Sequence, residues 1–250
     1  MAGSGTAHLR DASASLLRAE NIVVEFPIGS TGLKVHAVSD VSLDILPGET
    51  LGLVGESGSG KSTTGRALMQ MPSPTSGSVL LEQHDLTNLS GSDLREIRPQ
   101  MQMIFQDPFA SLNPRMTVES ILAEPLRNFD VIQGVDRREK IQHLLMTVGM
   151  DPRCMRRYPH EFSGGQRQRI GIARALALGP EFIVADEPIS ALDVSIQAQI
   201  MTLLKDLQKT AGKSFILITH NMALVSEVAD HVAVMYLGRV VEYGAVNEVL

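Results

Sequence analysis

The sequence predicts an α/β fold built around a parallel sheet. Three short apolar runs, at 51–54, 182–185 and 215–218, are hydrophobic on both faces, as the buried strands of a parallel sheet are. Helical patterns separate these runs: residues 195–207 place apolar side chains at helical spacing, and Gly212 stands where that helix would end. Strands that alternate with helices in this way are typical of an α/β protein.

Length and composition narrow the classes of protein that are possible. The 250 residues are 44% hydrophobic and 20% charged, which suits a folded globular chain and excludes disordered, collagen and coiled-coil classes. The net charge of -6 gives no sign of a general affinity for polyanions, and a nucleic-acid partner would need a local basic patch, so we expect none. The single cysteine, Cys154, excludes an internal disulfide or a thiolate metal cluster. No apolar stretch approaches the ~20 residues that cross a bilayer, so we expect the chain to stay in the cytosol and to reach a membrane only through a partner.

Along the chain we expect a leader, an α/β core and a helical insertion. Residues 1–18 are predicted to be a flexible leader, and residues 19–250 to form the domain. Residues 22–26 and 41–45 are predicted strands, the second with period-two alternation. The middle of the chain, at about 112–158, carries helical patterns broken by Pro and Gly, which predicts a helical insertion into the core.

A glycine-rich loop follows the first apolar run and precedes a predicted helix at 62–69. Its sequence, GESGSGKS, fits the pattern G-x-x-x-x-G-K-[ST]. Backbone N–H groups of such a loop surround phosphate oxygens, the helix N-terminus adds partial positive charge, and Lys61 adds a full charge. An ordinary glycine-rich turn is the alternative, and the strand and helix that flank the loop disfavour it. We therefore expect phosphates to be bound by Gly55, Ser57, Gly58, Ser59, Gly60, Lys61, Ser62 and Thr63.

Two carboxylates follow the second apolar run. Asp186 and Glu187 stand at the C-terminal edge of a predicted parallel strand, where ligands of open α/β sheets bind. Asp186 suits a Mg²⁺ site together with the Ser62 hydroxyl, and Glu187 is placed to polarise an attacking water. A solvated strand end is the alternative, and the glycine-rich loop upstream favours the metal and catalytic interpretation.

The segment SGGQRQR at 163–169 precedes an apolar helix and resembles the signature motif of ATP-binding cassette (ABC) ATPases. Other motifs of that family stand in the same order along the chain. Gln106 resembles the residue of the Q-loop, SALD at 190–193 the D-loop, and His220 the switch histidine. The resemblance covers about 20–245, which is nearly the whole chain.

Two further segments resemble one group within the family. Residues 106–116, QDPFASLNPRM, and residues 157–162, RYPHEF, are similar to the ATPase subunits of oligopeptide and dipeptide importers, a group that includes nickel and glutathione importers. Phe162 stands where Leu is more common in the family, and Ile189 where Thr or Val is; neither departure removes a catalytic group. Members of the group normally continue beyond the position of Leu250, so we interpret the chain as shortened or as one half of a fused pair.

The resemblance implies a P-loop ATPase fold with a RecA-like core, an antiparallel β subdomain and a helical subdomain at about 107–178. It implies ATP and Mg²⁺ as cofactors, with the metal held by Ser62, Gln106 and Asp186, and hydrolysis by Glu187, His220 and Gln106. Two cassettes would close head to tail, so that the signature of one covers ATP on the loop of the other. The further ATP contacts that the resemblance implies are Phe26, which would stack on adenine, and Ser163, Gly164, Gly165, Gln166 and Asp193.

The function that follows is the ATP-hydrolysing motor of an importer at the cytoplasmic face of the membrane. Its partners would be a second ATPase subunit, identical or different, permease subunits and, through the complex, an extracytoplasmic solute-binding protein. A soluble ABC ATPase of DNA repair or translation control is the alternative, disfavoured by the acidic charge, the single cassette and the absence of a long coiled-coil pattern. A catalytically inactive cassette is disfavoured because every motif residue is present. The sequence leaves the solute open.

Overall fold

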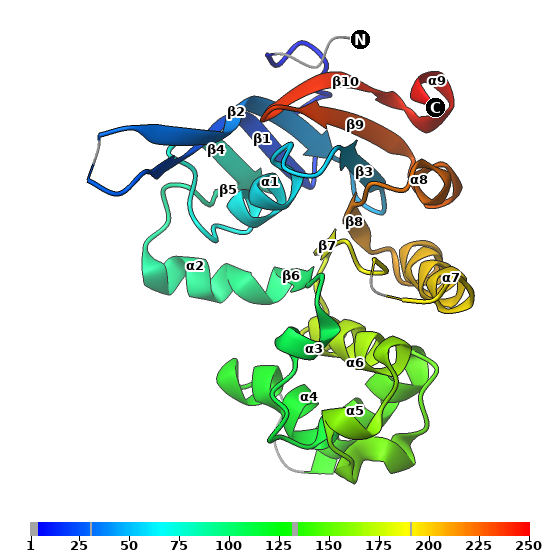
Figure 1. The fold of residues 1–250 in the computed structure, drawn as a ribbon. Helices are drawn as coiled ribbons and strands as arrows, with labels where there is room; N and C mark the ends of the chain where they lie inside the picture. The colour runs from blue at the N-terminus through cyan, green and yellow to red at the C-terminus, as the bar shows by residue number, and fades with distance from the viewer. Residues whose placement is uncertain (1–4, 31, 132–134, 191) are drawn as a thin grey trace.

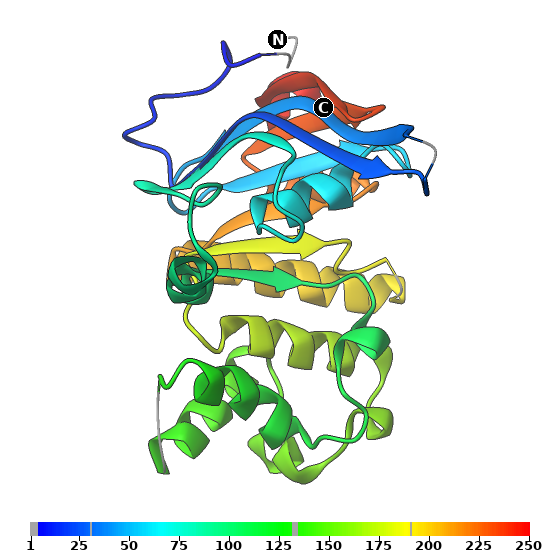
Figure 2. The ribbon, with the colours of Figure 1, turned by 90° about the vertical axis from the view of Figure 1, so that its left-hand side faces the viewer.

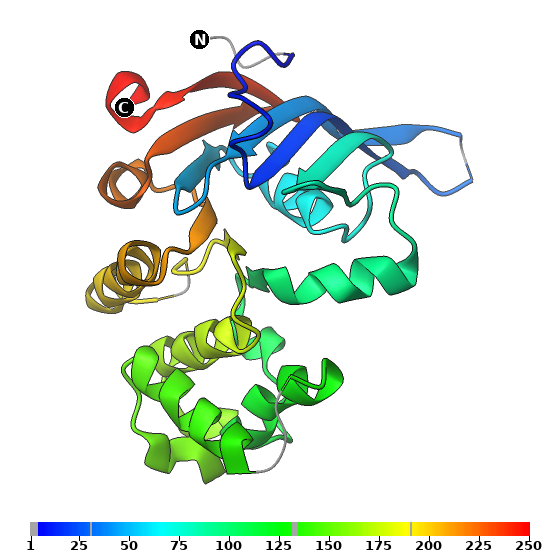
Figure 3. The same ribbon diagram turned by 180° about the vertical axis from the view of Figure 1, so that it is seen from behind.

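The structure, a computed structural model, describes residues 5–30, 32–131, 135–190 and 192–250. Figure 1 shows two sheets stacked at one end of the molecule and a group of helices at the other end, remote from both termini. Figure 2 shows the same layers from the side, with the helical group beneath the core, and Figure 3 shows them from behind.

A six-stranded sheet forms the centre of the core. Its order is β10-β9-β3-β8-β7-β6, and the pairs β9–β3, β3–β8, β8–β7 and β7–β6 are parallel, while β10 is antiparallel to β9. This arrangement confirms the predicted α/β class. The strands are β3 (Thr50–Gly55), β6 (Met101–Ile104), β7 (Phe182–Asp186), β8 (Ser214–Ile218), β9 (His231–Tyr236) and β10 (Arg239–Ala245).

A second, four-stranded sheet is antiparallel and has the order β2-β1-β4-β5. It provides the antiparallel β subdomain that the family resemblance implied. Its strands are β1 (Leu17–Pro27), β2 (Lys34–Ile45), β4 (Ser76–Leu81) and β5 (His84–Asp85).

Helices cover both faces of the six-stranded sheet. The described helices of the core are α1 (Lys61–Leu68), α2 (Gly91–Ile97), α7 (Val194–Ala211), α8 (Met222–Val228) and α9 (Val246–Val249). Four more helices lie between β6 and β7 in the chain: α3 (Pro108–Ser111), α4 (Val118–Asn128), α5 (Val135–Thr147) and α6 (Gly164–Leu176). α4 and α5 fall inside the insertion predicted at about 112–158, whereas α3 and α6 extend it on both sides. We keep the name helical subdomain for residues 107–178, the range that the family resemblance implied.

The residues of β7 show why this strand is apolar throughout. Phe182 and Val184 belong to the hydrophobic cluster between the two sheets, which also holds α1, whereas Ile183 and Ala185 belong to the cluster on the other face with α6 and α7. All four side chains are fully buried. Burial on both faces is what the uninterrupted apolar run predicted.

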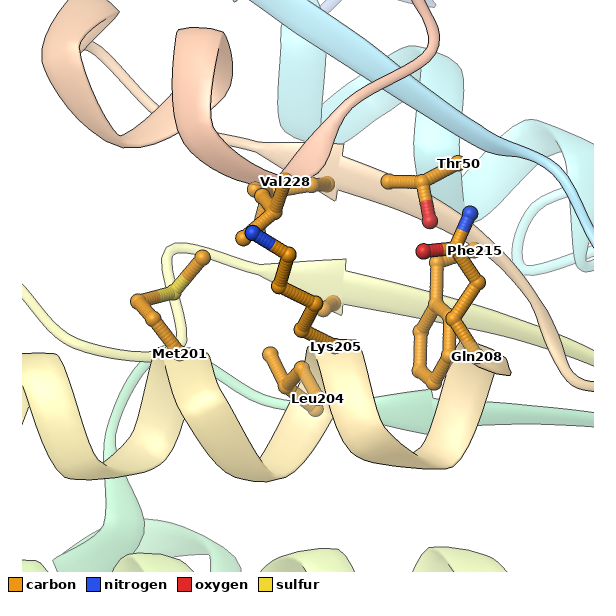
Figure 4. A pocket seen from close by; sticks show the side chains of 9 residues that line it. Thr50, Met201, Leu204, Lys205, Gln208, Phe215 and Val228 are labelled. Carbon is orange, nitrogen blue, oxygen red and sulfur yellow. The ribbon is translucent and has the colours of Figure 1, made fainter. Parts of the chain in front are cut away.

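The helix α7 packs closely against the sheet. It ends where predicted, since Gly212 follows it with φ 61°, a left-handed conformation that glycine adopts without steric cost. A cavity of about 10 Å³ remains between α7, β8 and α8, with Met201, Leu204 and Phe215 among its walls (Figure 4). Such a space holds at most one water molecule, so it is a packing gap and no ligand site.

The leader departs from its prediction in two ways. The strand β1 begins at Leu17, so the segment expected to extend through residue 18 is shorter. The guanidinium of Arg10 pairs with two buried carboxylates, Nε with Asp44 Oδ2 at 2.8 Å and Nη2 with Glu49 Oε2 at 2.7 Å. Buried carboxylates require a cation, and the sequence of the leader does not reveal that Asp44 and Glu49 lie beneath it. In the described part of the chain, no helix is both long enough and apolar enough to cross a bilayer.

Candidate active site

The glycine-rich loop lies between β3 and α1, at the C-terminal edge of the six-stranded sheet. It opens into a hollow of about 450 Å³, here called the loop hollow. Eight of the predicted site residues line it, from the loop, from the turn after β6 and from the end of β7. They are Ser57, Gly58, Gly60, Lys61, Ser62, Thr63, Gln106 and Glu187.

Close backbone packing explains two of the glycines in the loop. Gly55 has φ 147° and Gly60 has φ 101°, conformations that residues with a Cβ rarely adopt. A Cβ on Gly55 would collide with the carbonyl oxygen of Met235, and one on Gly60 with that of Ala37. The glycines thus hold the loop against β9 and β2, with the N-terminus of α1 facing the hollow.

Lys61 is folded back onto its own loop. Its Nζ donates hydrogen bonds to the carbonyl oxygens of Gly55 at 2.8 Å and Glu56 at 2.7 Å, and it lies 3.5 Å from Ser59 Oγ. Burial lowers the pKa of Lys61, while the nearby carboxylates of Glu187 and Asp186 act in the opposite direction. The ammonium group therefore bonds to neutral carbonyl oxygens in this structure, and a negatively charged phosphate would attract it away from them.

Asp186 and Ser62 meet beneath the loop. Ser62 Oγ donates a 2.7 Å hydrogen bond to Asp186 Oδ1, and no donor among the described residues bonds to the buried Oδ2. Burial raises the pKa of Asp186, opposed by the Ser62 hydrogen bond and the charge of Arg66. A hydroxyl and a buried carboxylate oxygen with no hydrogen bond are hard oxygen ligands of the kind that Mg²⁺ takes, so the donor set fits this ion.

The three predicted catalytic side chains meet at one carboxylate. Gln106 Nε2 donates to Glu187 Oε2 at 2.8 Å, and His220 Nδ1 lies 3.4 Å from Glu187 Oε1, the distance of a weak hydrogen bond. Glu187 itself has φ 44°, and its backbone N–H donates to the carbonyl of Ile218 on the neighbouring strand. Left-handed backbone at a glutamate is uncommon, and here it turns the side chain out of β7 toward the loop hollow.

The predicted signature residues lie elsewhere. Ser163 and Gln166 form a capping box at the start of α6: Ser163 Oγ accepts from the N–H of Gln166 at 3.4 Å, and Gln166 Oε1 accepts from the N–H of Ser163 at 3.1 Å. Ser163, Gly165 and Gln166 line a separate hollow of about 400 Å³, and Gly164 is the first residue of α6. Asp193 is the N-cap residue of α7. None of these residues lines the loop hollow, and α6 lies well below α1 (Figure 2).

The remaining predicted contact, Phe26, is half exposed at 41% and does not line the loop hollow. Its cross-strand partner Val35 does, together with His36 and, from the turn between β9 and β10, Leu237. The stacking role of Phe26 stays a prediction. The sequence does not mark Val35, His36 and Leu237 as lining residues, because only tertiary packing brings these segments to the loop.

A larger hollow of about 690 Å³ separates the core from the helical subdomain, and we call it the inter-subdomain hollow. Its walls include Arg66 of α1, Gln106, Glu124 of α4 and Arg174 of α6. Gln106 therefore borders both this hollow and the loop hollow. Arg66 was not predicted, although it follows Ser62 by four residues and so shares one face of α1 with it.

Comparisons with known proteins agree with this geometry. A family model described as "ABC transporter" matches residues 38–190. The probable peptide ABC transporter ATP-binding protein y4tS of Sinorhizobium fredii is 52% identical over 235 residues, which are 92% of this chain and 67% of that protein. The oligopeptide transport ATP-binding protein AppF of Bacillus subtilis is 49% identical over 94% of this chain and 73% of its own length. The chain spans 38% of a third relative, the glutathione import ATP-binding protein GsiA of Pectobacterium atrosepticum, at 50% identity.

Solved structures show the same architecture. A dimeric post-hydrolysis state of the ATP-binding cassette MJ0796 bound to ADP and Pi superposes with a TM-score of 0.83 at 30% identity, over 92% of this chain and 98% of that one. The protein cbiO1 from Clostridium perfringens, described as part of the transporter complex cbiONQ, gives a TM-score of 0.82 at 27% identity, over 94% and 90% of the two chains.

Proposed function

The chain belongs to the ABC transporter family of ATP-binding cassettes, and from this premise we propose that it is the ATP-hydrolysing motor subunit of a membrane importer, with oligopeptides or dipeptides as the imported solutes. The observation that carries the proposal is the convergence of loop, metal-binding and catalytic groups at one edge of the sheet. Lys61, Ser62 and Asp186 lie beside Glu187, which Gln106 and His220 contact.

Hydrolysis follows from these positions. Glu187 would accept a proton from a water that attacks the γ-phosphorus; the bond from that phosphorus to the bridging oxygen of ADP breaks, and ADP and phosphate leave. Lys61 and the first turn of α1 would hold the negative charge that spreads over the phosphate oxygens. His220 would fix the orientation of Glu187 and the γ-phosphate. A Mg²⁺ held by Ser62 and Asp186, with Gln106 as the third predicted ligand, would neutralise charge on the phosphates when it is bound.

Gln106 occupies part of the acceptor capacity of Glu187. Its Nε2 donates to Glu187 Oε2, so a movement of Gln106 would free one acceptor position of this oxygen for a water. Gln106 directly precedes the helical subdomain, so a movement of that subdomain would change the bond. We therefore assign to Gln106 the link between subdomain movement and the protonation chemistry.

The site is completed by a second cassette. The signature residues Ser163, Gly165 and Gln166 line a different hollow from that of Lys61, so a single chain does not bring the signature to its own loop. Relatives solved as dimers support closure of two cassettes, one covering the phosphates of the other. The second cassette is either an identical copy or a sister subunit.

The inter-subdomain hollow is the place where we expect a permease subunit to dock. It has a volume of about 690 Å³ and touches the catalytic cluster, because Gln106 stands in its wall. A permease segment seated there would move Gln106 and the helical subdomain together. In the proposed complex the motor would act at the cytoplasmic face of a membrane, and an extracytoplasmic solute-binding protein would be a further partner.

The test is ATP-dependent association and transport. Light scattering should show the Glu187→Gln variant as a monomer without nucleotide and as a dimer with Mg·ATP, alone or with a candidate sister cassette. Copurification with permease subunits and peptide uptake by the reconstituted complex would identify the importer. Copurification with nucleic acid instead, or no mass increase in any mixture, would contradict the proposal.

A further inference from the structure

We propose that Arg66 is the resident counter-ion of Asp186 in the metal-free site, and that a divalent cation binding at Asp186 displaces it into the inter-subdomain hollow. The inference deepens the proposed function and rests on it, since it takes Asp186 as a ligand of the metal that accompanies ATP. Its consequence is that the wall of the hollow changes its charge distribution when the metal is bound.

The two residues on α1 that contact Asp186 share one face of the helix. Ser62 and Arg66 are four residues apart, so their side chains lie one turn from each other. Ser62 Oγ donates to Asp186 Oδ1 at 2.7 Å, and Arg66 Nη2 lies 3.6 Å from Asp186 Oδ2. The helix α1 thus interacts with both oxygens of the carboxylate: Ser62 hydrogen-bonds to Oδ1, and the charge of Arg66 lies near Oδ2.

Asp186 needs a positive neighbour because its side chain is only 1% exposed. A buried carboxylate without compensating charge is costly, and its second oxygen receives no hydrogen bond from the described residues. Lys61 is the other cation nearby, but its ammonium donates to loop carbonyls at Gly55 and Glu56. Among the ion pairs of the described residues, Arg66 alone comes within 4 Å of this carboxylate.

The metal and the guanidinium compete for the same oxygen. A cation held by Asp186 would be a second positive group beside the carboxylate that Arg66 now neutralises, and two neighbouring positive groups would repel each other. The Arg66 side chain can move into the inter-subdomain hollow, because it is 50% exposed and lines that hollow. The 3.6 Å separation is longer than a charge-assisted hydrogen bond, so Arg66 compensates the charge of Asp186 without a directional bond to it.

Gln106 stands in the wall of the same hollow, and it bonds to Glu187. Two side chains therefore connect this hollow to the acidic pair at the end of β7. Arg66 lies near Asp186, and Gln106 donates to Glu187. A partner docked in the hollow would meet the Arg66 charge in one place before the metal binds and in another afterwards.

Metal affinity tests the competition directly. The probe is Mn²⁺, followed by electron paramagnetic resonance of the free ion, with a non-hydrolysable ATP analogue at saturation so that turnover plays no part. We expect Arg66→Met to bind Mn²⁺ more tightly by about threefold to tenfold, because a repelling charge is removed. Arg66→Lys keeps the charge and should stay within about a factor of two of the parent.

The matched control is Arg98→Met. Arg98 lines the same hollow, but it donates to the carbonyl of Met69, and among the described residues it forms no ion pair with Asp186. Its replacement should leave Mn²⁺ affinity unchanged. Equal effects of Arg66→Met and Arg98→Met, or weaker binding in Arg66→Met alone, would overturn the competition.

Two readouts without bound metal separate this inference from the proposed function. In EDTA and without nucleotide, Arg66→Met should melt about 2–4 °C below the parent because Asp186 loses its counter-ion, and Mg²⁺ with the analogue should reduce the gap. The side-chain Nε–H NMR signal of Arg66, assigned by its absence in Arg66→Lys, should shift when Mg²⁺ and the analogue are added. An unshifted signal or an unchanged melting temperature in EDTA would refute the ion pair, whereas failure of the parent to bind the analogue would refute the proposed function alone.

Discussion

The helices α1 and α6 begin at the two glycine-rich motifs of the sequence, and their first turns are built differently. α1 starts after Gly60, which has no side chain to cap it, with Lys61 as its first residue. α6 starts after Ser163, whose hydroxyl accepts from the N–H of Gln166 while the Gln166 side chain accepts from the N–H of Ser163. The first turn of α1 is therefore open to an external anion, whereas that of α6 is partly satisfied within its own chain.

The difference follows from where each helix end is proposed to act. α1 is proposed to bind the phosphates of a nucleotide held by its own chain, so its open first turn and Lys61 would be filled by that ligand. α6 is proposed to act on the nucleotide of a partner, and it must be a stable helix before that partner arrives. Its capping box provides this stability at the cost of N–H groups that would otherwise face the phosphate.

The helical subdomain, which contains α6, and the core, which contains α1, also differ in net charge. Residues 107–178 hold eleven Lys and Arg and eight Asp and Glu, a net +3, while the rest of the chain holds eleven and twenty, a net −9. Head-to-tail closure would place the helical subdomain of one cassette against the core of the other, so opposite net charges would meet despite the overall −6 of each chain.

The largest effect is expected at the catalytic carboxylate on the α1 side. Glu187→Gln keeps the shape of the side chain and removes the base, so ATP hydrolysis should slow by ~10²–10⁴-fold while nucleotide affinity is retained. Phosphate release measures the rate, and a fluorescent ATP analogue measures the affinity. Turnover within a factor of about three of the parent would remove Glu187 from the role of base.

The open end of α1 is tested by removing its charge. Lys61→Ala should weaken ATP binding by ~10–150-fold, since a hydrogen bond from a charged group to a ligand is generally worth ~1.5–3 kcal/mol. Titration with the fluorescent analogue measures the change. Lys205→Ala on α7, whose ammonium donates to the carbonyl of Glu227 far from the loop, is the control and should bind like the parent.

A substitution at the capped end of α6 should have the opposite pattern, with ATP binding retained and hydrolysis reduced. Ser163→Ala leaves the loop hollow intact, so ATP affinity of the isolated chain should be unchanged, while hydrolysis should fall by about tenfold or more if the Ser163 hydroxyl reaches a partner's phosphate. Mixing Ser163→Ala with Lys61→Ala creates one dimer site with an intact loop and an intact signature. Activity should return in the mixture, and a mixture as inactive as its components would contradict a shared site between identical chains.

The smallest effect is structural. Gln166→Ala removes half of the capping box and should lower the free energy of unfolding by about 0.5–1 kcal/mol, as losses of a helix cap do. Denaturant unfolding measures it, with Gln142→Ala on α5 as a control of the same chemical change. If both variants lose equal stability, the box does not hold α6 in the monomer.

The sequence determined most of the fold and those parts of the site that lie within one short segment, namely the glycine-rich loop and the acidic pair at the end of β7. Apolar runs buried on both faces gave β3, β7 and β8, Gly212 marked the end of α7, and the glycine-rich pattern identified the loop with Lys61 and Ser62. These succeed because periodicity, turn geometry and phosphate binding by a loop depend on neighbours in the chain. The same locality explains why the roles of Asp186 and Glu187 could be expected directly after a parallel strand.

Tertiary structure decided what distant segments do to one another. The pairing of Arg10 with Asp44 and Glu49, the lining of the loop hollow by Val35 in place of Phe26, and the approach of Arg66 to Asp186 all join residues that are separated along the chain or hidden on a helix face. No local pattern specifies which charge will compensate a buried carboxylate, because that depends on which side chains the packed core brings within reach. The sequence by itself therefore determined which groups this protein carries for ATP chemistry, and the packing of its layers decided which of them share a site within one chain and which are left to face another.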